Sequence, residues 1–146
     1  MDMKKYFKQV FALENRIDEL CEKIEMLRAG QTSAGGFGDG WGGVQKSRNY
    51  RRQEDISVYI LELEGELAKA KISLLHLEAE IRAMAHSLKD SLARAIITWR
   101  YICRLKWKDI AARSEMSEMQ IIREHNAAMA HMEHENICGL TNSIAN

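Results

Sequence analysis

Two long stretches of this chain carry apolar residues at alternating steps of three and four, and the chain contains no proline to interrupt a helix. Such spacing places one apolar stripe along an α-helix, and a second helix must cover that stripe. The pattern therefore predicts two long helices that pack as a coiled coil. The first stripe, within residues 3–29, consists of Met3, Tyr6, Val10, Leu13, Ile17, Leu20, Ile24 and Leu27. The second, within residues 53–88, consists of Ile56, Ile60, Leu63, Leu67, Ala70, Leu74, Leu77, Ile81, Met84 and Leu88.

A glycine-rich segment, residues 30–50, separates the two stripes. It predicts a flexible loop that lets the two helices fold back as an antiparallel hairpin. The segment lacks the Lys-Ser/Thr ending of a phosphate-binding loop. We expect Phe37 and Trp41 to pack on the coiled coil, with a role as partner anchors as the alternative. The basic residues that follow predict a solvated loop end or, alternatively, phosphate contacts: Lys46, Arg48, Arg51 and Arg52.

One partner helix leaves each stripe partly uncovered, so the remaining cover must come from the C-terminal region or from a second subunit. The stripes therefore predict a homodimer formed through the coiled coil. The expected domains are the hairpin at residues 1–88, a helical domain at 89–134 and a flexible tail at 135–146. Within the tail, Gly139 is expected to end the last helix.

Shorter helical patterns follow the second stripe. Ser87 and Asp90 have the spacing of a helix start, which predicts a helix over about 88–103. A short helix is expected over 107–113. Ser117 and Gln120 then form a capping box that opens a third helix. The buried face of this last helix is predicted to consist of Ile121, Ala128, Met129 and Met132.

This order of helix, short helix, tight turn and exposed helix is typical of a helix-turn-helix, whose last helix can enter the major groove of DNA. Arg123 is the best candidate base reader, because a guanidinium can bridge O6 and N7 of guanine, while Gln120 and Asn126 have the amide chemistry for adenine. The predicted base-reading residues are Glu118, Met119, Gln120, Ile122, Arg123 and Asn126, with Ser117 as the helix cap. The predicted phosphate contacts are Arg100, Arg104, Lys106, Lys108 and Arg113.

The charge balance limits how strongly this chain can bind DNA. It has 21 basic and 21 acidic residues, a formal net charge of zero. The basic set around residues 100–113 is opposed by nearby acidic residues, so the affinity of one copy is expected to be modest. Dimerisation, or a second DNA-bound protein, would then be needed to strengthen binding.

Residues 92–132 resemble region 4 of sigma-70-type factors, which reads the −35 promoter element. The matching residues are Trp107-Lys-Asp-Ile110-Ala111, then Ser117, Ile121 and Ala128-Met129, preceded by Arg100-Tyr101-Ile102. With its long helical hairpin, the whole chain is similar to small phage late-gene transcription activators of the ArpU-like and RinA-like kinds. The resemblance implies that the helix from Ser117 is the recognition helix and that host RNA polymerase is a partner. Two departures concern turn geometry: Glu115 and the Arg104-Leu105 link stand where a glycine or asparagine is usual.

These patterns favour one function and leave two alternatives open. The leading hypothesis is a sequence-specific, DNA-binding transcription regulator of phage or prophage origin, in the cytoplasm of a bacterial host. The alternatives are a small terminase subunit for DNA packaging and a helical interaction or inhibitor protein that does not bind DNA. We expect no enzyme and no cofactor, because the chain has no recognisable constellation of catalytic residues.

The remaining residue patterns predict a cytoplasmic protein without a bound metal. The three cysteines, Cys21, Cys103 and Cys138, are far apart and odd in number, which favours a reducing compartment without disulfides. His125, His131 and His134 are interpreted as a polar helix end, because a structural zinc site would need paired ligands from two elements. We expect neither a signal peptide nor a membrane span.

Overall fold

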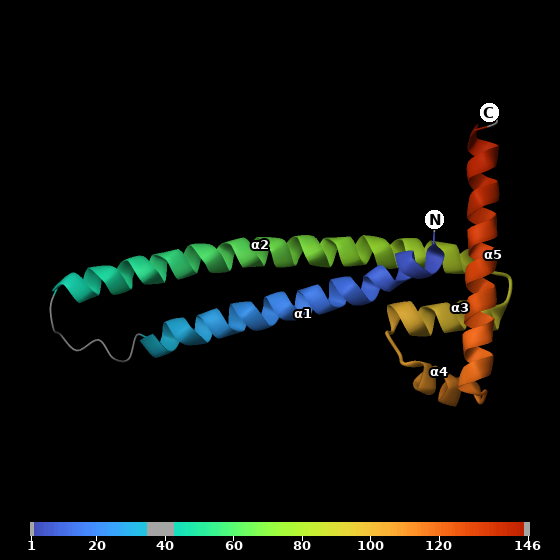
Figure 1. The fold of residues 1–146 in the computed structure, drawn as a ribbon, viewed down its shortest axis with the longest axis horizontal. Helices are drawn as coiled ribbons and strands as arrows, with labels where there is room; N and C mark the ends of the chain where they lie inside the picture. Colours follow the sequence, from blue (N-terminus) through green and yellow to red (C-terminus); the bar gives the residue numbers. More distant parts are fainter. Residues whose placement is uncertain (1, 35–42, 145–146) are drawn as a thin grey trace. The chain divides into compact units, whose positions relative to one another are not determined.

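The computed structural model describes residues 2–34 and 43–144, with side chains over 2–31 and 50–136, and within these ranges the chain is all-α, as predicted (Figure 1). Two long helices come first, followed by three shorter segments and a long last helix. In chain order these are α1 (Met3–Ala34), α2 (Gly43–Ser87), α3 (Ser91–Ile97), the π-helical segment η1 (Thr98–Ile102), α4 (Trp107–Ser114) and α5 (Glu118–Ile144).

The helices form two compact units that divide the chain differently from the predicted domains. Leu13–Ser73 forms one, here called the two-helix unit, while Met1–Ala12 and Leu74–Asn146 form the other, here called the C-terminal unit. The first turns of α1 belong to the C-terminal unit because the Phe7 ring packs edge-on against Tyr101, with centroids 5.1 Å apart. Phe7 and Tyr101 therefore belong to the same compact unit, although they are far apart in the sequence.

In the two-helix unit, α1 and α2 lie side by side and run in opposite directions (Figure 1). Arg16 pairs with Glu66 at 3.0 Å, and further along α1 the Gln31 amide donates to Ser57 at 3.0 Å. The core consists of Leu20, Ile24, Ile60 and Leu63, flanked by Leu27, Ile56 and Leu67. In both helices every residue of the two predicted stripes is buried or half-buried, so the predicted burial pattern is confirmed.

The long helices extend into the segment predicted to be a loop. Residues 30–34 continue α1, and α2 begins at Gly43 rather than near residue 50. The predicted loop 30–50 was therefore too wide. Glycine weakens a helix by only about 1 kcal/mol, so it does not exclude a helix from these positions. Phe37 and Trp41 lie outside the described residues, as do the side chains of Lys46 and Arg48.

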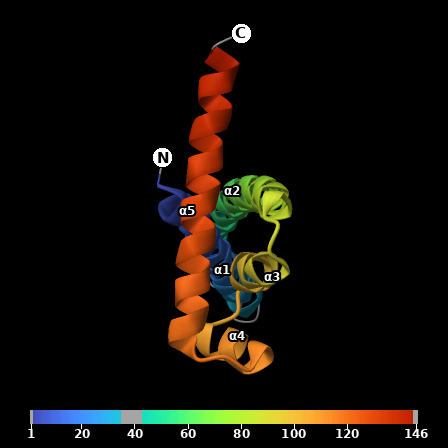
Figure 2. The ribbon, with the colours of Figure 1, turned by 90° about the vertical axis from the view of Figure 1, so that its right-hand side faces the viewer.

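The C-terminal unit has its core where α5 packs against α3 and α4, which lie on the same side of it in Figure 2. The fully buried part consists of Ile96, Ile110, Ala111 and Ile121. Half-buried side chains complete it: Leu92, Trp99, Leu105, Trp107 and Met116. Ile121, Ala128, Met129 and Met132 are all buried, which confirms the predicted inner face of α5.

The start of α3 differs from the prediction. Asp90 is the N-cap, because its carboxylate accepts from the backbone N–H of Leu92 at 3.1 Å. Ser87 instead ends α2, where its hydroxyl donates to the carbonyl of Met84 at 2.6 Å. The two residues therefore belong to different helix ends, and the predicted pairing of Ser87 with Asp90 was wrong.

The end of α5 also differs. The helix continues through Gly139 to Ile144, so the expected stop at Gly139 was wrong. A single glycine costs a helix about 1 kcal/mol, whereas a proline costs about 3. The sequence contains no proline to end the helix.

Candidate nucleic-acid interface

A three-residue turn joins α4 to α5, and its first residue has a left-handed backbone. Glu115 adopts φ 54° and ψ 35°, and its N–H donates to the carbonyl of Ala111. The N–H of Met116 donates to the same carbonyl at 3.2 Å. These two bonds close the C-terminus of α4 and reverse the chain. The turn thus needs the conformation expected of glycine at a position occupied by glutamate.

Ser117 and Gln120 form the capping box predicted for the start of α5. The Ser117 hydroxyl accepts from the N–H of Gln120, and the Gln120 side-chain oxygen accepts from the N–H of Ser117, both at 3.2 Å. The prediction is confirmed. It also assigns the side-chain oxygen of Gln120 to the cap, which leaves its amide NH2 as the group that could meet a base.

The first turns of α5 present two opposite strips. The inner strip, spaced 4, 3 and 4, is buried: Ile121, His125, Ala128 and Met132. The outer strip has the same spacing two positions earlier and is exposed: Met119, Arg123, Asn126 and Ala130. Met119 is 70% exposed, a large value for an apolar side chain near a helix start. Of the remaining predicted readers, Glu118 is exposed and Ile122 is half-buried.

Three of the five predicted phosphate contacts lie on the surface around α4. Lys106 precedes the helix, Lys108 belongs to its first turn and Arg113 to its last, and all three side chains are exposed. Lys106 is the N-cap residue of α4, and the other two belong to α4, which the turn joins to the start of α5. Among the predicted DNA-contacting residues, these three cations and Arg123 are therefore exposed basic side chains that contacts inside the unit leave available.

The other two predicted phosphate contacts are engaged inside the C-terminal unit. The Arg100 guanidinium stacks between the rings of Phe11 (4.8 Å) and Trp107 (4.6 Å) and donates to the carbonyl of Leu105 at 2.9 Å. Its guanidinium is therefore already engaged by contacts within the C-terminal unit.

Arg104 is engaged in the same way. Its guanidinium donates to Glu78 at 2.6 Å and to the carbonyl of Ile102 at 3.0 Å. Its backbone has φ 55°, two residues after the π-helical segment η1 ends at Ile102. Arg104 and Glu115, where glycine or asparagine was expected, thus both adopt positive φ. The Arg104 guanidinium is likewise already engaged within the C-terminal unit.

A buried polar pair that sequence reasoning missed lies under α5. The Tyr101 hydroxyl and Nε2 of His125 are 2.8 Å apart, and the His125 ring packs edge-on against Trp107 at 4.8 Å. His125 is 4% exposed, so its interpretation as part of a polar helix end was wrong. The signal was present, because His125 falls on the same spacing as Ile121, Ala128 and Met132.

Burial controls the titration of this pair. Burial lowers the pKa of His125 to about 4, and the positive charges of Lys4, Arg100 and Lys8 act in the same direction. A hydrogen bond to Asn126 opposes the shift. Burial also raises the pKa of Tyr101 to about 12. Near neutral pH the pair is therefore an uncharged phenol hydrogen-bonded to an uncharged imidazole.

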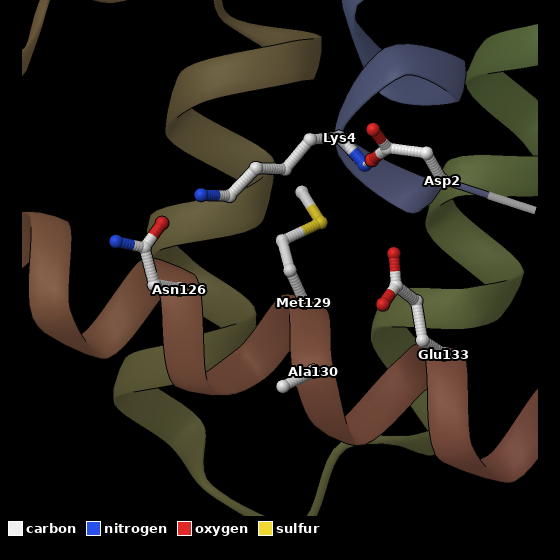
Figure 3. A pocket seen from close by; sticks show the side chains of 6 residues that line it. All are labelled: Asp2, Lys4, Asn126, Met129, Ala130 and Glu133. Atoms are coloured by element: carbon white, nitrogen blue, oxygen red, sulfur yellow. Dashed lines mark hydrogen bonds between the residues drawn. The ribbon is translucent and has the colours of Figure 1, made fainter.

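A surface pocket of about 570 Å³ lies beside the outer strip of α5, between α5 and the N-terminal residues of the same unit (Figure 3). The Lys4 side chain extends past Met129 toward Asn126. The N–H of Met3 donates to a Glu133 carboxylate oxygen at 2.7 Å and fixes the start of α1 here. Asn126, a member of the outer strip, therefore lines this pocket, where Lys4 adds a further cation. The pocket is lined by Asp2, Lys4, Asn126, Met129, Ala130 and Glu133.

The described residues contain no cluster of three or more side chains suited to hold a metal ion. His131 pairs with Glu135 at 3.6 Å along the exposed side of α5. In the described part of the chain, no helix combines the length and apolar character needed to cross a membrane.

Residues 42–133 match a family described as proteins of unknown function, DUF1492, and the chain belongs to this family. The matched region runs from the start of α2 through most of α5 and contains the turn, the capping box and the outer strip. It leaves out α1, which supplies Phe7 and Phe11 to the aromatic packing around Tyr101. No curated protein and no solved structure matches the chain.

Proposed function

We propose that this protein is a sequence-specific DNA-binding regulator of transcription, of phage or prophage origin, that reads a promoter element with the start of α5. The observation that carries the proposal is the outer strip of α5, in which Met119, Arg123 and Asn126 are exposed directly after a tight, capped turn. That arrangement suits a recognition helix, whose N-terminal residues meet base edges while the preceding helix contacts the backbone.

In this proposal each group has a distinct role. Arg123 reads guanine through O6 and N7, and Met119 contacts a thymine methyl group. Lys106, Lys108 and Arg113 contact phosphates and set the register of α5 in the groove. Glu118 and Gln120 lie at the rim, where a glutamate can accept from a cytosine amino group. Host RNA polymerase is the proposed protein partner, as the resemblance to sigma region 4 implies.

The small number of cations predicts moderate, salt-sensitive binding. Three phosphate contacts correspond to a slope of log K against log salt of about −3 for one copy. The slope is about −5 for a dimer in which both copies contact the DNA. Replacing Lys108 by alanine should reduce the slope of one copy by about 1 without changing the preferred sequence.

The test is a selection of preferred sites from random DNA duplexes, followed by binding titrations at two salt concentrations. The proposal predicts one enriched motif, and R123A should weaken binding to that motif by about 1–3 kcal/mol and relax one position in it. The matched control is R82A, since Arg82 is an exposed arginine on α2. Equal binding by the wild type and R123A would remove α5 as the reader.

The same experiment separates the alternatives. A ring-shaped assembly that selects a single packaging-type region would favour a small terminase subunit. Absence of any enriched motif and of binding at low salt would favour a helical interaction protein, in which α4 and α5 serve only as scaffold.

A further inference from the structure

The outward face of α2 carries a second apolar stripe that no described residue covers. It follows steps of three and four: Val58, Leu61, Gly65, Ala68, Ile72, Leu75 and Ala79. All of these residues are exposed, and Leu61 and Leu75 are each 66% exposed. They occupy the opposite side of the helix from the inner stripe of α2, the one that contains Ile60 and Leu63 and packs against α1. One helix, α1, therefore cannot cover both stripes. A helix with two apolar seams is suited to pack against two different partners.

This stripe is self-complementary in size when two copies run in opposite directions. About the midpoint between Glu66 and Leu67, Val58 is symmetric with Leu75 and Leu61 with Ile72. Two large apolar pairs then flank the centre on each side. At the centre, Gly65 meets Ala68, and a Cβ added at Gly65 would find nothing within 4 Å. Small residues at the centre let the two helices approach closely.

The charges beside the stripe are complementary in the same orientation. One flank carries Asp55 and Glu62 in its first half, then Lys69 and His76 in its second, all exposed and seven residues apart. An antiparallel copy places Glu62 opposite Lys69 of the second copy. The other flank carries Glu64, which also pairs with Arg28 of its own chain, and then the exposed Lys71. In a parallel pair, Glu62 and Lys69 would not meet.

We propose that this outer stripe of α2 is a homodimer interface on which a second copy of the chain docks antiparallel, centred between Glu66 and Leu67. It gives the homodimer expected from the coiled-coil pattern a defined face and register, on the outer rather than the inner stripe of α2. An isologous, two-fold contact of this kind closes on itself and stops at two copies. It places two recognition helices on one assembly, which suits a site with two-fold symmetry.

Light scattering on the full-length protein without DNA tests the interface, so failure here is distinct from failure to bind DNA. The expected mass is twice the 16.8 kDa of one chain. Combining L61E with I72E should raise the dissociation constant at least about tenfold, while circular dichroism stays unchanged because both positions are exposed. M26E, at a 75% exposed position on α1, is the matched control and should remain dimeric. A wild type that is monomeric at about 100 µM, or an L61E/I72E variant that stays dimeric, would overturn the proposal.

Charge exchange tests the orientation. E62K and K69E should each weaken the dimer severalfold at low ionic strength, because each brings like charges together across the interface. The double variant E62K/K69E should recover most of the loss in an antiparallel pair. If the loss of dimer affinity in the double variant equals the sum of the losses in the two single variants, the antiparallel register is wrong.

Disulfide trapping gives an independent readout of the register. In a background that lacks Cys21, Cys103 and Cys138, a mixture of G65C and A68C chains should form the mixed disulfide on mild oxidation. Cross-linking of G65C chains only with each other would instead indicate a parallel pair and contradict the proposal.

Discussion

The two-helix unit and the C-terminal unit are both helical, but they are stabilised in different ways. In the two-helix unit one repeating pattern determines burial, and much of the contact between helices is half-buried. The C-terminal unit instead combines fully buried Ile96, Ile110 and Ile121 with a buried Tyr101–His125 pair, a π-helical segment and two positive-φ residues. Regular repeats produce an extended scaffold, whereas departures from regularity concentrate where α5 is positioned.

The largest expected effect is a difference between the two units in the cost of truncating a core side chain. I121A, at a fully buried position of the C-terminal unit, should lower the free energy of unfolding by about 3 kcal/mol, because it leaves a cavity among tightly packed side chains. L67A, at a half-buried position of the two-helix unit, should cost about 1 kcal/mol. Urea denaturation followed by circular dichroism measures both. Equal losses would contradict the contrast between the units.

The next effect is a pH dependence confined to the C-terminal unit. Because the pKa of His125 falls from 6.5 to about 4 on folding, the unfolded chain binds the proton more readily. The contribution of neutral His125 to the free energy of unfolding is therefore fully present above about pH 6.5. It declines as the pH falls toward 4, by about 2 kcal/mol between about pH 7.5 and about pH 5. H125Q, which cannot titrate, should show a smaller loss over this range. An identical pH dependence in both proteins would exclude His125 as the cause.

A smaller effect isolates the hydrogen bond within that pair. Y101F keeps the ring that packs on Phe7 but removes the hydroxyl that lies 2.8 Å from His125. We expect a loss of about 1–2 kcal/mol, since a buried imidazole nitrogen loses its partner. The matched control is Y59F, on an exposed tyrosine of α2, which should change stability by less than about 0.5 kcal/mol. A Y101F protein as stable as the wild type would show that the bond contributes nothing.

The smallest effect tests backbone strain in the turn before α5. E115G should raise the free energy of unfolding by about 0.5–1 kcal/mol, because glycine adopts φ 54° without a Cβ clash. E115A keeps a Cβ and is the control, with no gain expected. If E115G is less stable than the wild type, the conformation of Glu115 is stabilised by its side chain rather than strained.

The sequence predicts the fold class, the burial of both stripes, the inner face of α5 and the capping box of Ser117 and Gln120. Each of these depends on spacing along one helix, which the sequence displays directly. The engaged roles of Arg100 and Arg104 could not be predicted, because they depend on contacts with Phe11 and Glu78, which are distant in the sequence. The start of α3 was misplaced because Ser87 and Asp90 have a plausible cap spacing but serve two different helix ends.

The most direct test of the central claim places a photo-reactive amino acid at one exposed position in each unit and measures its cross-linking to selected DNA. Met119 on the outer strip of α5 is the test position, and Met26 on α1 is the comparison. The account predicts an efficient cross-link to bases within the selected motif from position 119 and none from position 26. A cross-link from position 26 alone, or none from position 119 in a DNA-bound complex, would contradict the claim that α5 reads the DNA.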